Sequence, residues 1–155
     1  MRWINICLLL VVGFYLAAGD IRSSEASYAQ ENCAGGTCFK EWKLAANRGE
    51  AWAQYNLGTL YEDGDGVPKN YQKAVKWYRL SAEQGDSWAQ SKLGFLYKTG
   101  RGVEQDYNAA EKWYRLAAEQ GDAWAQSNLG MLYEDGNGIA QDYNQALKWY
   151  RLAAA

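Results

Sequence analysis

Two cysteines, Cys33 and Cys38, have a spacing that suggests covalent chemistry. They bracket Gly35 and Gly36, and a glycine pair supplies the flexible turn that brings two thiols within bonding range. The spacing differs from the Cys-x-x-Cys of redox motifs, and a metal site would need further cysteine or histidine ligands. The sequence favours a Cys33–Cys38 disulfide over free thiols, a metal site or a redox site.

Side chains suited to catalysis are scarce. The chain has no histidine, which removes the commonest general base and the commonest metal ligand together. Ser87, Ser91 and Ser127 are the candidate nucleophiles in the first helices of the repeats, and no base stands beside them. An acidic pair ending at Asp63 suggests calcium, but the twelfth position from it, where an EF-hand needs glutamate, is Ala74. We expect no enzyme activity, no cofactor and no bound metal.

Aromatic residues suggest a binding surface instead. They lie along one stripe of a helix, and this stripe recurs three times in the sequence. At about 100° per residue, this stripe lies roughly 150° from the centre of the apolar face of its helix. Its members are Trp52, Tyr55 and Thr59, then Trp88, Ser91 and Phe95, then Trp124, Ser127 and Met131. Exposed aromatics in a stacked row would bind a protein or peptide on the concave face of the array.

A second interpretation of the three tryptophans stays open. Each follows a leucine by eight residues across a tight glycine turn, so each indole would cover that leucine and fasten one repeat to the next. The leucines are Leu44, Leu80 and Leu116. Both roles are compatible if one indole face packs and the other remains in water.

These residues recur because the chain is an internal repeat. The phrase that begins at Gly85 returns at Gly121, 36 residues later, and a related phrase begins at Gly49. A fixed period in this range indicates a solenoid, in which each unit buries its apolar face only by stacking on its neighbours.

Each repeat divides into two helices. In the first full repeat, residues 50–62 carry apolar side chains at helical spacing, and Gly58 beside them permits close approach of another helix. Turn residues follow, and a second helix is expected from Tyr71 to Glu83, with Gly85 closing it. The residues suited to capping the second helices are Asn70, Asp106 and Asp142.

The N-terminus is typical of an export signal. Arg2 precedes an apolar run over residues 7–18, and small residues allow cleavage near Gly19 or near Ala29. The run is shorter than the roughly 20 residues that cross a bilayer, so we expect membrane attachment only if the signal stays uncleaved. The protein is therefore expected to be exported, to the periplasm or outside the cell.

The expected domains follow from these features. A signal peptide covers residues 1–19, a linker with the disulfide loop covers 20–37, and the solenoid covers 38–155. The solenoid has a half repeat at 38–48, which supplies a lone second helix as a cap, and full repeats at 49–84, 85–120 and 121–155. The last helix lacks a following partner, so we expect that this end docks a partner, associates with a second copy, or belongs to a longer array that is cut short. The apolar residues there are Tyr143, Ala146, Trp149 and Tyr150.

The repeat motif itself points to a family. The pattern Ala-x-Ala-Gln-x-x-Leu-Gly-x-Leu-Tyr-x-x-Gly-x-Gly-Val, followed by Asp-Tyr-x-x-Ala-x-x-Trp-Tyr-x-x-Ala-Ala-Glu-Gln-Gly, resembles the Sel-one-like repeat, a relative of the tetratricopeptide repeat. The resemblance covers residues 40–155. It implies an all-α, right-handed αα superhelical solenoid and a scaffold or adaptor role in protein complexes, and bacterial members are often exported.

The functional expectation is an exported protein-interaction scaffold. The net charge is −2, and lysine and arginine are scattered among acids, so no nucleic acid partner is expected. The alternative is a cell-wall or peptidoglycan-associated glycan binder or hydrolase, because stacked aromatic faces also bind sugars. Cysteine-rich relatives are described as β-lactamase or penicillin-binding proteins, but their cysteine pairs lie inside the repeats, where this chain has none.

Overall fold

The computed structural model describes residues 37–155, which fold into seven α-helices without any β-strand. The expected signal peptide, both cleavage sites and Cys33 lie outside the described residues, while Cys38 lies in the first turn of α2. The helices are α2 (Thr37–Asn47), α3 (Ala51–Asp63), α4 (Tyr71–Glu83), α5 (Ser87–Thr99), α6 (Tyr107–Glu119), α7 (Ala123–Asp135) and α8 (Tyr143–Ala153).

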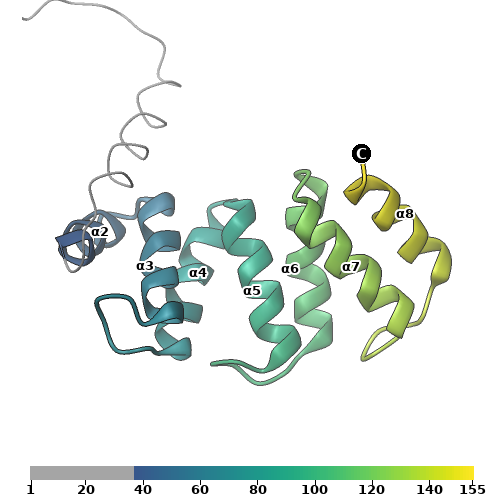
Figure 1. Ribbon diagram of the computed structural model, residues 1–155, viewed down its shortest axis with the longest axis horizontal. Helices are drawn as coiled ribbons and strands as arrows, with labels where there is room; N and C mark the ends of the chain where they lie inside the picture. Colours follow the sequence, from purple (N-terminus) through teal and green to yellow (C-terminus); the bar gives the residue numbers. More distant parts are fainter. Residues whose placement is uncertain (1–36) are drawn as a thin grey trace, which may run out of the picture. The chain divides into compact units, whose positions relative to one another are not determined.

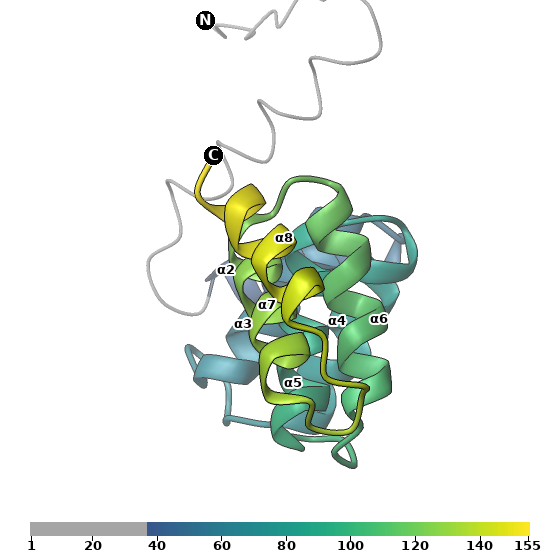
Figure 2. The ribbon, with the colours of Figure 1, turned by 90° about the vertical axis from the view of Figure 1, so that its right-hand side faces the viewer.

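The helices follow one another in chain order, and each packs on the next (Figure 1). We call α3, α5 and α7 the A helices, and α2, α4, α6 and α8 the B helices. Seen along the stack, the three A helices lie to one side and α4 and α6 to the other (Figure 2). The described part is therefore a solenoid of helix-turn-helix repeats, which confirms the predicted fold class.

Capping side chains set the helix starts. Asn70 accepts a hydrogen bond from Lys73 N at 2.9 Å, and the equivalent aspartates cap α6 and α8 in the same way, as predicted. Sequence reasoning missed a second set of caps on the A helices. Asp86 and Asp122 accept from the backbone of Ala89 and Ala125 at 2.8 and 2.7 Å.

A glycine column brings the two helices of each repeat together. A Cβ on Gly58 would lie 2.7 Å from the ring of Tyr78, and one on Gly94 would lie 2.8 Å from the ring of Tyr114. Both rings are fully buried. The predicted close approach is confirmed, and a tyrosine ring of the B helix occupies the space that the missing side chain leaves.

Buried glutamines join one repeat to the next. Gln54, Gln90 and Gln126 of the A helices each donate to a carbonyl near the end of the preceding B helix, at 3.2, 3.1 and 3.0 Å. Within each repeat, Gln84 and Gln120 donate to the side chains of Gln54 and Gln90, both at 2.7 Å. Buried amides must satisfy their hydrogen bonds, so this glutamine ladder fixes the register between repeats.

The apolar residues named from the sequence in the last helix differ in exposure. Tyr143 is 65 % exposed, but Ala146 and Trp149 are 3 % and 5 % exposed. Trp149 belongs to a core cluster with Leu129 and Leu132 of α7. Two of the four residues named from the sequence therefore pack inward, while α8 still exposes Tyr143, Leu147 and Leu152. Within residues 37–155, no helix has the length and apolarity to span a bilayer.

Candidate functional site

The aromatic stripe of the A helices differs in exposure from repeat to repeat. Trp88 is 63 % exposed and Trp124 is 46 % exposed, whereas Ser91 is buried. Met131 lies at the surface, and the half-buried members are Trp52, Tyr55, Thr59, Phe95 and Ser127. The stripe therefore presents two prominent indoles rather than an even row of three.

Trp88 is held by an aromatic ring of the preceding repeat. Its ring centroid lies 5.8 Å from that of Tyr55, with the planes at 60°. Tyr55 in turn lies 5.7 Å from the buried ring of Tyr78. Edge-to-face and tilted contacts of this kind stabilise aromatic pairs. The ring of Tyr55 thus contacts both the exposed indole and the buried phenol.

Trp124 packs differently, because Ser91 stands at the position that Tyr55 occupies one repeat earlier. Without an intervening ring, Trp124 lies directly against Tyr114 and Phe95, with both centroid distances at 5.8 Å. A groove of about 350 Å³ is left between Trp88 and Trp124. The lining residues are Tyr55, Trp88, Ser91, Lys92, Asp122 and Trp124.

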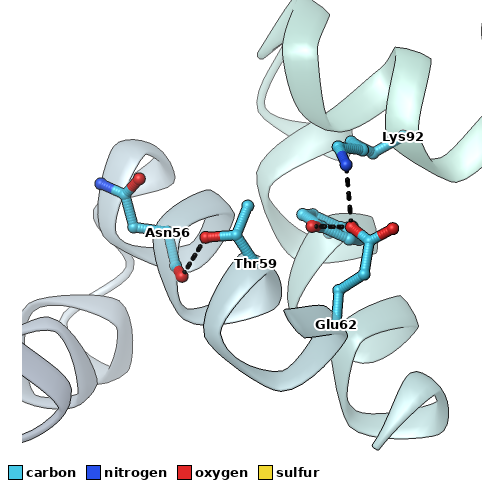
Figure 3. Close-up of polar contacts among 5 residues, drawn as sticks. Asn56, Thr59, Glu62 and Lys92 are labelled. Carbon is cyan, nitrogen blue, oxygen red and sulfur yellow. Dashed lines mark hydrogen bonds and ion pairs between the residues drawn. The ribbon is translucent and has the colours of Figure 1, made fainter. Parts of the chain in front are cut away.

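Charged groups at this groove are already paired. Lys92 Nζ forms an ion pair with Glu62 Oε2 (Figure 3), at 3.0 Å, and Glu62 also accepts a hydrogen bond from the hydroxyl of Tyr78 at 2.5 Å. Burial and the hydrogen bond to Glu62 raise the pKa of Tyr78 well above its ordinary range, so this phenol stays neutral. Asp122 accepts from the backbone as the cap of α7.

The other members of the stripe make local contacts. Thr59 Oγ1 donates to the carbonyl of Asn56 at 2.7 Å (Figure 3), and Trp52 Nε1 donates to Glu50 at 2.8 Å. Burial raises the pKa of Tyr55 above its ordinary value. Ser91 Oγ is buried without a hydrogen-bond partner.

The leucines of the second interpretation are themselves at the surface. Leu44 is 55 % exposed, and Leu80 and Leu116 are each 37 % exposed. Trp88 and Trp124 also make ring contacts with aromatic side chains. These contacts leave much of each indole in contact with solvent. The covering of the leucines by the tryptophans stays a prediction.

The groove was not foreseen, although the stripe that borders it was. The sequence does contain a sign of the groove. Ser91 stands at the position of Tyr55, so the aromatic ring between Trp88 and Trp124 is missing. Elsewhere, no group of three or more potential metal-ligating side chains forms within residues 37–155.

Paired helices stacked through a buried ladder define a helical-repeat solenoid, the class of protein in which surfaces are assembled from successive units. The Sel1 repeat family model matches residues 53–86, 89–122 and 125–155. The chain therefore belongs to the Sel1 repeat family, whose members are generally protein-interaction scaffolds.

Solved structures with the same fold include a Sel1 repeat protein from Oxalobacter formigenes, 38 % identical with a TM-score of 0.77, and a protective antigen of uropathogenic Escherichia coli, 36 % identical with a TM-score of 0.79. Each match covers 84 % of this chain, but only 55 % and 29 % of those chains. A Sel1-like repeat-containing protein of Acanthamoeba polyphaga mimivirus is 57 % identical over 35 residues, which is 23 % of this chain and 6 % of that protein.

Proposed function

We propose that this protein is an exported interaction scaffold that holds a partner protein at the groove between Trp88 and Trp124 and performs no catalysis of its own. The supporting observation is the groove itself, where two indoles that are 63 % and 46 % exposed border about 350 Å³ of open volume. Tryptophan is enriched among the few residues that dominate binding energy at protein interfaces.

The absence of catalysis is supported by the state of the groove serine. Ser91 Oγ is buried and makes no hydrogen bond, so no base is placed to activate it as a nucleophile. The two ionisable groups beside it, Lys92 and Asp122, already have partners in the fold. These properties of the groove favour a role in binding over a role in catalysis.

Export is supported by the N-terminal sequence. Arg2 followed by the apolar run over residues 7–18 is typical of a signal peptide, and a Cys33–Cys38 bridge would form in an oxidising compartment. Protein recovered from the exported fraction should lack its N-terminal segment and show no free thiol. Intact protein retained in the cytoplasm would contradict export.

The binding role is tested with Trp88→Ala. A partner cross-linked to the wild-type protein in its own cells is identified by mass spectrometry, purified, and titrated calorimetrically against the variant. We expect binding to weaken by about 2 kcal/mol, or roughly thirtyfold in Kd, while helicity is retained. Leu44→Ala is the control, because it removes an exposed apolar side chain that is not part of the groove. Equal affinity of wild type and Trp88→Ala would exclude this surface.

A further inference from the structure

The same position in successive A helices holds Tyr55, then Ser91, then Ser127. In the first repeat, the phenol ring contacts the buried ring of Tyr78 and the exposed ring of Trp88 at centroid distances of 5.7 and 5.8 Å. The first repeat thus shows that an aromatic ring at this position can pack against the tryptophan of the next A helix.

One repeat further on, Ser91 supplies no ring. The groove opens there, and the hydroxyl oxygen of Ser91 is buried with no hydrogen-bond partner. Ser91 is itself only 3 % exposed, so its hydroxyl belongs to the wall of the groove rather than to the open surface.

Charge and size restrict what could fill the space. Lys92 and Asp122 contribute one cation and one anion to the lining, and both are engaged within the protein. With Lys92 paired to Glu62, the groove has no free cation among its described lining residues, so an anionic side chain buried in it would lack compensation. Its volume of about 350 Å³ lies at the lower end of ligand sites, which run from roughly 300 to 1,000 Å³. This suits one large neutral side chain with its flanking backbone.

We propose that the groove takes an aromatic side chain of an extended partner peptide, with the ring lying over Ser91 between Trp88 and Trp124. This inference deepens the proposed function and rests on it. Tyrosine is the best fit, because its ring matches the one that Tyr55 provides in the first repeat and its hydroxyl gives a polar end that the rim of the groove can meet.

The test uses a substitution that fills the groove from within. Ser91→Tyr supplies the ring that the partner would otherwise insert, and Thr99→Tyr adds the same side chain at an exposed position near the end of the same helix. N-acetyl-tyrosinamide is titrated into the full-length protein while the indole N–H signals of Trp88 and Trp124 are followed by NMR. We expect saturable shifts in wild type and in Thr99→Tyr, and binding at least about tenfold weaker in Ser91→Tyr.

Two further probes test whether the groove prefers an aromatic side chain to an aliphatic side chain or a sugar. N-acetyl-leucinamide should bind at least about threefold more weakly than the tyrosine probe, because it lacks a ring to contact the indoles. N-acetylglucosamine should leave the two signals unshifted. Stronger shifts with the sugar than with the tyrosine probe, or equal binding of the leucine probe, would overturn the proposal.

The two proposals fail in different ways. If the cross-linked partner loses affinity for Trp88→Ala but binds Ser91→Tyr as well as wild type, the scaffold function stands and the aromatic insertion is wrong. If both variants bind the partner normally, the surface itself is wrong. Should Ser91→Tyr not fold, as judged by circular dichroism, Trp124→Ala replaces it. That variant removes one wall of the groove and should weaken binding of the tyrosine probe equally, and normal binding would overturn the proposal.

Discussion

Lys98 occupies a position where the other two full repeats have glutamate. In those repeats the acid accepts a hydrogen bond from a tyrosine of the B helix, Tyr78 to Glu62 at 2.5 Å and Tyr150 to Glu134 at 2.6 Å. The equivalent hydroxyl, that of Tyr114, is buried and has no partner. One residue thus leaves a polar atom unsatisfied in the middle of the array.

Replacing that lysine should stabilise the protein. Lys98→Glu places a carboxylate sixteen residues before Tyr114, the same separation as in the other two pairs. A net gain of about 1 kcal/mol in the free energy of unfolding is expected in urea denaturation at neutral pH. Lys98→Ala is the control, because it removes the lysine without adding an acceptor. An equal gain in both variants would show that the lysine, not the missing acceptor, is the cause.

A second residue-scale prediction concerns the glycine column. Gly94→Ala improves helix propensity by up to about 1 kcal/mol, yet its Cβ would lie 2.8 Å from the buried ring of Tyr114. Overpacking costs about 1–3 kcal/mol, so the steric effect should win and lower the unfolding free energy by about 1–2 kcal/mol. Gln72→Ala, at an exposed position of α4, should change it by less than about 0.5 kcal/mol. A Gly94→Ala variant that is more stable than wild type would show that α5 and α6 can move apart enough to accommodate the added methyl group without cost.

At the scale of elements, the contact between A and B helices depends on neutral phenols. Burial raises the pKa of Tyr114 above its ordinary value, and burial with a hydrogen bond to an acid raises those of Tyr78 and Tyr150, the last to about 12. A raised pKa means that the folded state favours the protonated phenol. This contribution is complete below the unfolded value of about 10 and is lost as the pH rises towards the folded values.

Alkali should therefore loosen the helix pairs. We expect the free energy of unfolding to fall between roughly pH 9 and 12, with phenol ionisation, followed by ultraviolet absorbance, accompanying loss of helicity. Tyr150→Phe removes one of these phenols and should reduce the slope of that fall. If the tyrosines ionise with ordinary pKa values while the helices remain intact, these three phenols are more accessible to water than their packing indicates.

The elements themselves were largely predictable from the sequence, because helical spacing, turn glycines and caps are local signals. Asn70 and its two equivalents are capping residues as expected, and the column of Gly58 faces a neighbouring helix as expected. The groove was not predictable in the same way. The groove arises because Ser91 has no aromatic ring and because Trp88 and Trp124 come from successive repeats. The distance between these two tryptophans is set by helix packing and not by their spacing in the sequence.

At the scale of the whole described array, contacts run almost entirely between neighbouring helices. Within residues 37–155, α2 packs chiefly on α3 and α8 chiefly on α7, whereas α5 contacts α4, α6 and α7. In such a linear arrangement, stability is close to a sum of the repeats and their joints. The two end helices should then open at lower free energy than the middle ones.

Hydrogen exchange followed by mass spectrometry can measure this gradient. Amides of α2 and α8 should exchange fastest and those of α5 and α6 slowest, because the middle helices are covered on both sides. Uniform protection along the array would instead mean that the repeats open as one unit, or that a partner copy covers the ends.

The glutamine ladder bears on how such a chain evolves. The joint between the first and second full repeats, Gln90 Nε2 to Ala82 O at 3.1 Å, is the same bond as the joint between the second and third, Gln126 Nε2 to Ala118 O at 3.0 Å. A gene duplication that inserts one more copy would therefore meet matching joints on both sides. A tyrosine codon at the position of Ser91 would add a copy that closes a groove, and a serine codon would add one that opens it. Array length can thus change by recombination, while the number of grooves changes by single codons.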